Sequence, residues 1–265
     1  MSSVTKRIHE ISQPRGGYVK LEQFTLKSFN DDKELYEENL PPQLIGLVVD
    51  YLTRFMLTKD VLRAFSISFQ GYEFRIMWLG EDQRKHDKLK GVSIDSLLSK
   101  VKGLDDESII AACKACSYDV WRRATPILAL TAPLASDIFP DKSTINNIRV
   151  MVNRSISFLE NNGPLVKVGP TFEPGYSKIV NTGDGDYLTE DCIWDFKVSK
   201  NKPNKEHTLQ LLMYWILGQH SNREEFSCVN KIGIYNPRLN QAYILNIENI
   251  SKETISIVEK DVICY

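Results

Sequence analysis

The sequence predicts an α/β protein of the α+β kind, in which a mixed central β-sheet is flanked by helices. Apolar residues recur at helical spacing between residues 44 and 55. An apolar, β-branched run with two charged interruptions spans residues 192–198. Two more strand-like runs, at residues 231–235 and 241–246, are joined by a short turn. Together these patterns indicate helices first and a sheet later in the chain.

We expect residues 1–140 to form a mainly helical region and residues 141–265 to form the sheet-containing core, packed as one compact unit. The first part of the chain is polar up to Glu38, apart from a short strand expected at residues 18–24. The Gln-Pro-Arg-Gly-Gly-Tyr loop at residues 13–18 offers backbone N–H groups and an arginine to a phosphate. A plain turn explains the same residues.

The clearest helix of the chain begins at Pro41 and Pro42. The apolar positions that follow are spaced by three and four residues as far as Phe55, so they share one face. A second helix is expected from Asp60 and is interrupted at Gly71. Both helices should turn their apolar faces inward.

Three segments in the middle of the chain each have two interpretations. The charged run at residues 84–90 suits a DNA-facing edge or a solvated linker. Helices are expected at residues 94–101 and 108–123, and the Trp-Arg-Arg triplet at 121–123 suits base stacking and phosphate binding or an ordinary helix end. Prolines break the apolar segment at 127–135, which we interpret as a buried connection or a short helix.

The remaining helices and strands follow from caps and turn residues. Ser143 or Thr144 can cap a helix over residues 145–159. The two C-terminal strands are joined by a compact turn at residues 236–240. A last helix, over about residues 252–262, is expected to cover the sheet.

A strand at residues 192–198 is the centre of the candidate site. Asp195 and Lys197 lie two residues apart, so both side chains emerge from the same face of this strand. The opposite face is expected to carry Trp194, Phe196 and Val198.

Two more acids precede this strand. A short strand is expected at residues 177–180, followed by a turn at 181–185. This turn would bring Asp184 and Asp186 to the end of a hairpin. Each aspartate lies beside a glycine, where aspartate also often serves only to complete a turn.

A helix expected at residues 206–217 follows the strand. Gln210 and Tyr214 are spaced i, i+4 on it and share a face. We interpret the nearby His207 as a surface residue at the start of the helix.

Two carboxylates with a backbone carbonyl suit a magnesium or manganese ion, which lowers the pKa of bound water and polarises a phosphodiester.

Three motifs follow in order on the expected strands and helix: Gly183-x-x-Asp186, Asp195-Phe196-Lys197 and Gln210-x-x-x-Tyr214. This series resembles the motifs of the RecB-like nucleases in the PD-(D/E)xK superfamily. The resemblance covers roughly the last third of the chain and implies a PD-(D/E)xK nuclease-like core.

The resemblance also implies the roles of the site residues. Asp186 and Asp195 would bind Mg²⁺ or Mn²⁺, with the Phe196 carbonyl as a further ligand, and Lys197 would be catalytic. Glu173 is a possible further acid. Gln210 and Tyr214 would steady the DNA or the lysine. Asp186 is preferred to Asp184 because its position fits the G-x-x-D motif.

Composition sets the limits for these hypotheses. The 265 residues include 33 Lys and Arg against 34 Asp and Glu, for a net charge of −1, so DNA binding would need a local basic groove. No uncharged run approaches the ~18 to 20 residues of a membrane helix, and the first residues lack a secretory signal. The sequence therefore predicts a cytoplasmic protein.

Cys113 and Cys116 form a close pair that we interpret as packing residues on a helix rather than as iron–sulfur ligands.

The first functional hypothesis is a metal-dependent deoxyribonuclease. The alternative is a catalytically inactive protein of the same fold that serves as a DNA-binding or scaffold component. It is favoured by the stretch from Ile145 to Leu159, which lacks the histidine that many RecB-like nucleases carry before the first acid. Another phosphoesterase or an unrelated α/β enzyme is a third hypothesis. Relatives of this kind work in DNA repair, recombination and defence, so protein partners in such a complex are possible.

Overall fold

The computed structural model describes residues 2–265, which divide into two compact units. The sheet unit contains the N-terminal residues up to Asp31 and residues 157–265, and the helical unit contains residues 32–156. The N-terminal segment joins the sheet unit because its strand Thr25–Ser28 pairs antiparallel with the strand Gln241–Asn246. This division differs from the expected boundary at residue 140.

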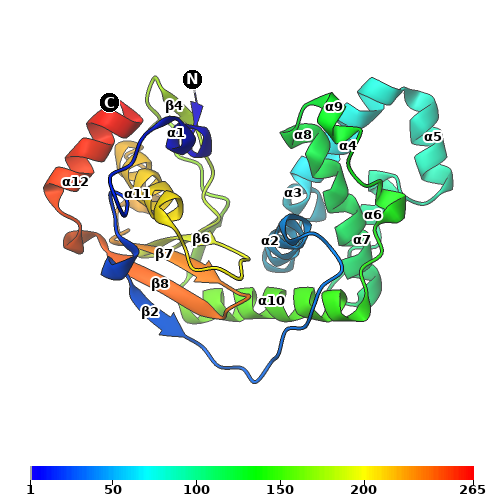
Figure 1. Ribbon diagram of the computed structural model, residues 1–265, viewed down its shortest axis with the longest axis horizontal. Coiled ribbons are helices and arrows are strands. Elements are labelled where there is room, and N and C mark those ends of the chain that lie inside the picture. The colour runs from blue at the N-terminus through cyan, green and yellow to red at the C-terminus, as the bar shows by residue number, and fades with distance from the viewer. Residues whose placement is uncertain (1) are drawn as a thin grey trace. The chain divides into compact units, whose positions relative to one another are not determined.

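The sheet unit is mixed α/β (Figure 1). Its N-terminal elements are β1 (Ser2–Ser3), α1 (Val4–Glu10), η1 (Leu21–Gln23) and β2 (Thr25–Ser28). After the end of α10 (Lys142–Asn161) come β3 (Leu165–Val168), β4 (Val180–Thr182), β5 (Tyr187–Thr189), β6 (Cys192–Phe196) and α11 (Lys205–His220). The last elements are η4 (Glu224–Phe226), β7 (Lys231–Asn236), β8 (Gln241–Asn246), η5 (Ile247–Asn249), α12 (Lys252–Ile257) and a π-helical turn (Val258–Ile263).

Six strands form the main sheet in the order β2-β8-β7-β6-β5-β3. Strands β6 and β7 are parallel, and every other neighbouring pair in this sheet is antiparallel. Parallel neighbours need a crossover connection, and α11 supplies it between β6 and β7. The short strands β1 and β4 pair parallel in a separate two-stranded sheet.

The two faces of β6 have different surroundings, as the alternation of its side chains predicted. Ile193 is fully buried in the same apolar core as Leu209, Leu212 and Met213 of α11. On the opposite face, Trp194 packs edge-on against Phe158 with ring centres 4.8 Å apart. Asp195 is therefore on the side of the sheet that α11 covers.

The helical unit contains the helices predicted for the first half of the chain, with different ends. They are α2 (Pro42–Thr58), α3 (Val61–Ala64), α4 (Ser66–Leu79), α5 (Glu81–Leu89), α6 (Ile94–Leu98), α7 (Asp106–Cys116), η2 (Ser117–Asp119), α8 (Val120–Arg123), α9 (Pro126–Ala129), η3 (Ala135–Asp137) and α10 as far as Ile156. Buried Asp119 links three of them, since it accepts hydrogen bonds from the Tyr51 and Ser68 hydroxyls, both at 2.6 Å. Cys113 and Cys116 are buried free thiols on α7, in keeping with a packing role.

The structure differs from the prediction at Gly71 and at the charged run of residues 84–90. Gly71 lies inside α4, where a Cβ would collide with the Tyr118 carbonyl, so this glycine allows close packing rather than ending a helix. The charged run lies mostly in α5 and is no linker. Its Asp87 is buried and forms an ion pair with Arg75 of α4, which fixes the helix in place.

The structure also decides between the expectations for three other segments. The described chain has no strand at residues 18–24; η1 (Leu21–Gln23) lies within this range, and β2 begins directly after it. In the apolar segment at 127–135, α9 supplies the short helix, but Ile127 is 78% exposed, so the segment is not a buried connection. Trp121 is buried, and Arg123 donates to Asp119, so the triplet at 121–123 belongs to the packing of the unit.

Within residues 2–265, none of the helices is both long enough and apolar enough to cross a membrane.

Candidate functional site

The antiparallel pairing of β5 and β6 brings the two candidate metal-binding acids together. Tyr187 is opposite Trp194, and Leu188 is opposite Ile193. Asp186 comes one residue before the first of these pairs, so it lies beside the end of β6 that carries Asp195. Its Oδ2 accepts a hydrogen bond of 2.7 Å from the backbone N–H of Phe196. A contact between neighbouring strands therefore fixes the position of the Asp186 carboxylate.

The hairpin forms from different strands than expected. Only Val180 of the expected strand at residues 177–180 is in β4, and β4 pairs with β1 instead of β6. The Ser177 hydroxyl accepts from the N–H groups of Ile179 (3.2 Å) and Val180 (3.0 Å), which closes a local turn. The short strand β5, which sequence reasoning missed, takes the place of the expected strand.

Gly183 of the G-x-x-D motif is a close-packing position. A Cβ at this residue would lie 2.6 Å from Cγ2 of Val4 on α1 and 3.5 Å from Cε1 of Tyr214 on α11. The glycine therefore lets the segment before Asp186 pass close to both helices. Asp184 is exposed and forms an isolated bridge with Thr171.

Asp195 and Lys197 form a close ion pair on the α11 side of β6. The Lys197 Nζ lies 2.9 Å from both carboxylate oxygens of Asp195. The Asp195 side chain is only 3% exposed, whereas that of Lys197 is 28% exposed. The two side chains emerge together, as the two-residue spacing predicted, and Lys197 lies between a buried carboxylate and solvent.

Helix α11 adds Gln210 and Tyr214 to this pair. The Lys197 ammonium donates to Gln210 Oε1 at 3.3 Å, and Gln210 Nε2 donates to the Tyr214 hydroxyl at 2.7 Å. Burial of Tyr214, and after it the charge of Asp195, raises the pKa of the phenol well above its usual value. The phenol therefore stays protonated. Through these contacts the Asp195-x-Lys197 and Gln210-x-x-x-Tyr214 motifs form one chain of polar contacts.

Glu173 is less closely connected to the site. Its side chain is exposed, in the loop before β4. Burial raises the pKa of Tyr176 to about 12, and the charges of Glu173 and Asp184 contribute in the same direction. Glu173 and Asp184 thus both lie near Tyr176, and the role of Glu173 as a further acid stays a prediction. The same holds for the Phe196 carbonyl as a ligand.

His207 was expected to be a surface residue, but the structure places it half-buried in the first turn of α11. It belongs to a capping box: Asn204 Oδ1 accepts from the His207 N–H at 3.1 Å, and the Asn204 N–H donates to His207 Nδ1 at 3.2 Å. Burial lowers the pKa of His207, and the positive charge of Lys197 lowers it further. Its spacing of three residues from Gln210 was the available signal of proximity to the site.

The ligand atoms around Asp195 are oxygens, the type that a hard divalent cation prefers. Asp195 Oδ2 is buried and accepts no hydrogen bond from the described residues 2–265, although the ammonium of Lys197 is close. Carboxylate oxygens are the ligands that Mg²⁺ and Mn²⁺ prefer. Within residues 2–265, no group of three or more His, Cys, Asp or Glu side chains is placed so that it could hold a metal ion.

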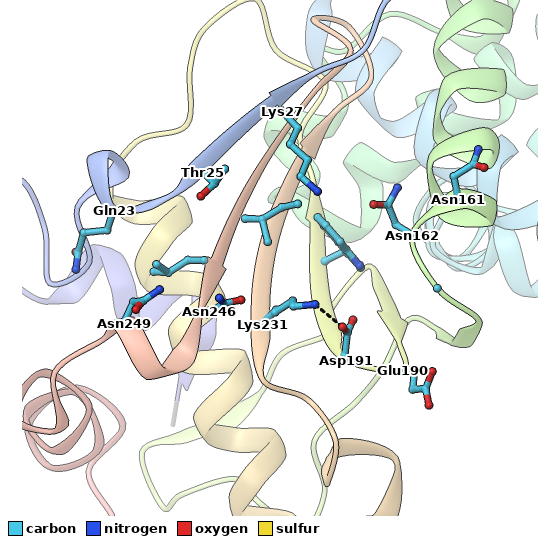
Figure 2. Close-up of a pocket in the computed structure, with 14 residues that line it drawn as sticks. Gln23, Thr25, Lys27, Asn161, Asn162, Glu190, Asp191, Lys231, Asn246 and Asn249 are labelled. Carbon is cyan, nitrogen blue, oxygen red and sulfur yellow. Dashed lines mark hydrogen bonds and ion pairs between the residues drawn. The ribbon is translucent and has the colours of Figure 1, made fainter.

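The sheet unit also has a polar cavity of about 410 Å³, whose lining residues are drawn in Figure 2. Trp194, on the face of β6 opposite to Asp195, lines it together with Lys27 and Asn162. Figure 2 shows the ion pair of Lys231 with Asp191 at its edge. The cavity includes none of the residues of the three motifs, so it is separate from the candidate site.

No protein family model matches this chain, and no curated protein or solved structure is significantly similar to it.

Proposed function

We propose that this chain is a metal-dependent deoxyribonuclease with a PD-(D/E)xK nuclease-like core of the RecB-like kind. One observation carries the proposal: Asp195, Lys197, Gln210 and Tyr214 form a continuous set of polar contacts beside Asp186. These residues come from two strands and a crossover helix. Their grouping in space agrees with the order and spacing of the three motifs.

The two aspartates would hold Mg²⁺ or Mn²⁺, with the Phe196 carbonyl as a further ligand. The bound ion would supply a nucleophilic water at neutral pH and polarise the phosphodiester. The Lys197 ammonium lies next to the buried carboxylate of Asp195, where it can stabilise the negative charge that builds up on the phosphoryl oxygens. Gln210 accepts from this lysine and orients its ammonium.

Tyr214 supports the same arrangement from the next turn of α11. Its hydroxyl accepts from Gln210 Nε2, which fixes the orientation of the amide so that Oε1 faces Lys197. The ring stacks on Phe172 with centres 5.1 Å apart. Tyr214 is therefore a positioning residue that acts through Gln210.

A cleavage assay tests this proposal. The wild-type chain is incubated with single- and double-stranded DNA and with Mg²⁺, Mn²⁺ or EDTA. We expect cleavage that needs the metal and that Asp195→Asn, Asp186→Asn and Lys197→Ala each abolish. Asp184→Asn is the matched control, because this exposed aspartate lies two residues before Asp186 and should leave cleavage intact. Full metal-dependent activity in the Asp195 and Lys197 variants would eliminate the assignment.

The alternative function, a DNA-binding or scaffold component without turnover, is favoured by a specific contact. The Lys197 ammonium lies 2.9 Å from both oxygens of Asp195, where it balances the charge of this carboxylate without a metal. Calorimetric titration with Mn²⁺ separates the two functions. A nuclease should bind the ion and lose that binding in the Asp186→Asn and Asp195→Asn variants, whereas a scaffold should show no specific binding to lose.

The cellular setting is also part of the proposal. A cytoplasmic nuclease of this kind would act on DNA together with protein partners in a repair or defence complex. Cell fractionation would test the cytoplasmic location. Affinity capture with the inactive Asp195→Asn variant bound to DNA would test for the protein partners.

A further inference from the structure

We infer that His207 contacts the substrate, donating a hydrogen bond from its Nε2–H to a DNA phosphate oxygen in the candidate site. This inference rests on the proposed function and adds a phosphate-binding residue outside the three motifs. It depends on the position of His207 on α11, the tautomer of its ring and the charges around it.

The position follows from helical spacing. His207 lies three residues before Gln210 and seven before Tyr214, so the three side chains share one face of α11. Gln210 accepts a hydrogen bond from Lys197, so this face of α11 is directed toward the end of β6. The histidine is thus on the side of the helix that carries the site, one turn nearer to the helix start.

The tautomer follows from the capping box. Nδ1 of His207 accepts the backbone N–H of Asn204 at 3.2 Å, so it carries no proton itself. In a neutral imidazole the proton must then be on Nε2, which makes this atom a donor. The capping contact therefore holds the ring in one orientation with its donor nitrogen available.

The charges around the ring favour a neutral donor over a cation. Burial lowers the pKa of His207, the charge of Lys197 lowers it further, and Asp195 and Glu206 act in the opposite direction to a smaller extent. At neutral pH the ring is therefore uncharged and does not compete with Lys197 for the carboxylate of Asp195. A phosphate oxygen, which only accepts hydrogen bonds, is the natural partner for such a donor.

Cleavage kinetics of two substitutions test the inference. In His207→Gln the amide can still donate to a phosphate and accept from Asn204, whereas His207→Met has a similar length and neither ability. We expect kcat/KM to fall at least about 10-fold in the Met variant, as for a lost hydrogen bond to a charged group, and to be largely retained in the Gln variant. The control is His220→Ala on the same helix, where the ring stacks on Tyr265 at 3.8 Å, away from the motif residues.

A second measurement does not depend on whether the variants fold. With Ca²⁺ in place of Mg²⁺, nitrogen-15 spectra of wild-type histidine side chains are recorded with and without a single-stranded oligonucleotide. We expect the Nε2 signal of His207 to shift on DNA binding and the signals of His220 to stay in place.

The outcomes separate this inference from the proposed function. If the wild-type protein cleaves DNA and the Met variant cleaves equally well, the His207 inference is overturned and the nuclease assignment stands. An unchanged Nε2 signal in the DNA complex also overturns it. If the wild-type protein neither cleaves nor binds DNA, both fail.

Discussion

Replacement of Lys197 by methionine removes the positive charge beside Asp195 and keeps most of the side-chain volume. The Asp195 side chain is 3% exposed, and the lost ammonium lies 2.9 Å from each of its oxygens. Removal of one partner from a fully buried ion pair costs about 3–5 kcal/mol. Because the Lys197 side chain is 28% exposed, water can partly replace the lost charge, and we expect a loss of about 1–3 kcal/mol in the free energy of unfolding.

Manganese should reverse much of this loss. The ammonium competes with a cation for the Asp195 oxygens in the wild-type protein, whereas the variant offers them without competition. A ligand at a hundred times its Kd stabilises the folded state by about 2.7 kcal/mol. Urea unfolding with and without Mn²⁺ measures both effects. Lys200→Met, at an exposed lysine three residues later, is the matched control and should change stability by less than about 0.5 kcal/mol.

Two results would refute this reasoning. One is a Lys197→Met variant that unfolds at the same urea concentration as the wild-type protein. The other is Mn²⁺ that stabilises the variant no more than the wild-type protein.

Three further predictions concern packing, pH and the helical unit. Gly183→Ala should cost about 1–3 kcal/mol in unfolding experiments, because the new Cβ would lie 2.6 Å from Cγ2 of Val4; combined with Val4→Ala, the loss should be smaller than the sum of the single losses. Burial lowers the pKa of His207, so below its unfolded value of about 6.5 the unfolded chain binds a proton that the folded chain does not. Stability should therefore fall as the pH drops from 7 to 5, and urea midpoints should fall less steeply in His207→Gln. Tyr51→Phe removes a 2.6 Å hydrogen bond to buried Asp119 and should lower the thermal unfolding midpoint, at a cost of about 1–3 kcal/mol.

Long elements with regular patterns could be predicted from the sequence. The helix that begins at Pro42 has a proline in its first turn and apolar residues at regular spacing, and these local features agree with its packing. The strand Cys192–Phe196 and the pair β7 and β8 carry enough β-branched and aromatic residues to be recognised. In each case local preference and tertiary packing favour the same structure.

Short elements could not be predicted because their partners are distant in the chain. β5 has only three residues and depends on pairing with β3 and β6. The run at residues 177–180 has apolar residues typical of a strand, but the Ser177 hydroxyl closes a turn there instead. Such a competition between local hydrogen bonds and strand pairing is decided by neighbours that composition does not identify.

The candidate site was likewise predictable only where local pattern determines it. The common face of Asp195 and Lys197 follows from the two-residue period of a strand. The contact of Lys197 with Gln210 depends on the path of the loop and crossover helix between them. The half-buried position of His207 likewise depends on its capping contact with Asn204 and could not be deduced from its surface-like sequence context.

A crystal structure of the wild-type protein soaked in Mn²⁺, with anomalous diffraction data, tests the central claim most directly. The account predicts one manganese ion bonded to the carboxylates of Asp186 and Asp195, with Lys197 displaced from one of the Asp195 oxygens that it now approaches at 2.9 Å. A saturated crystal with no ion at these two aspartates, and with Lys197 still bound to both oxygens, would contradict it.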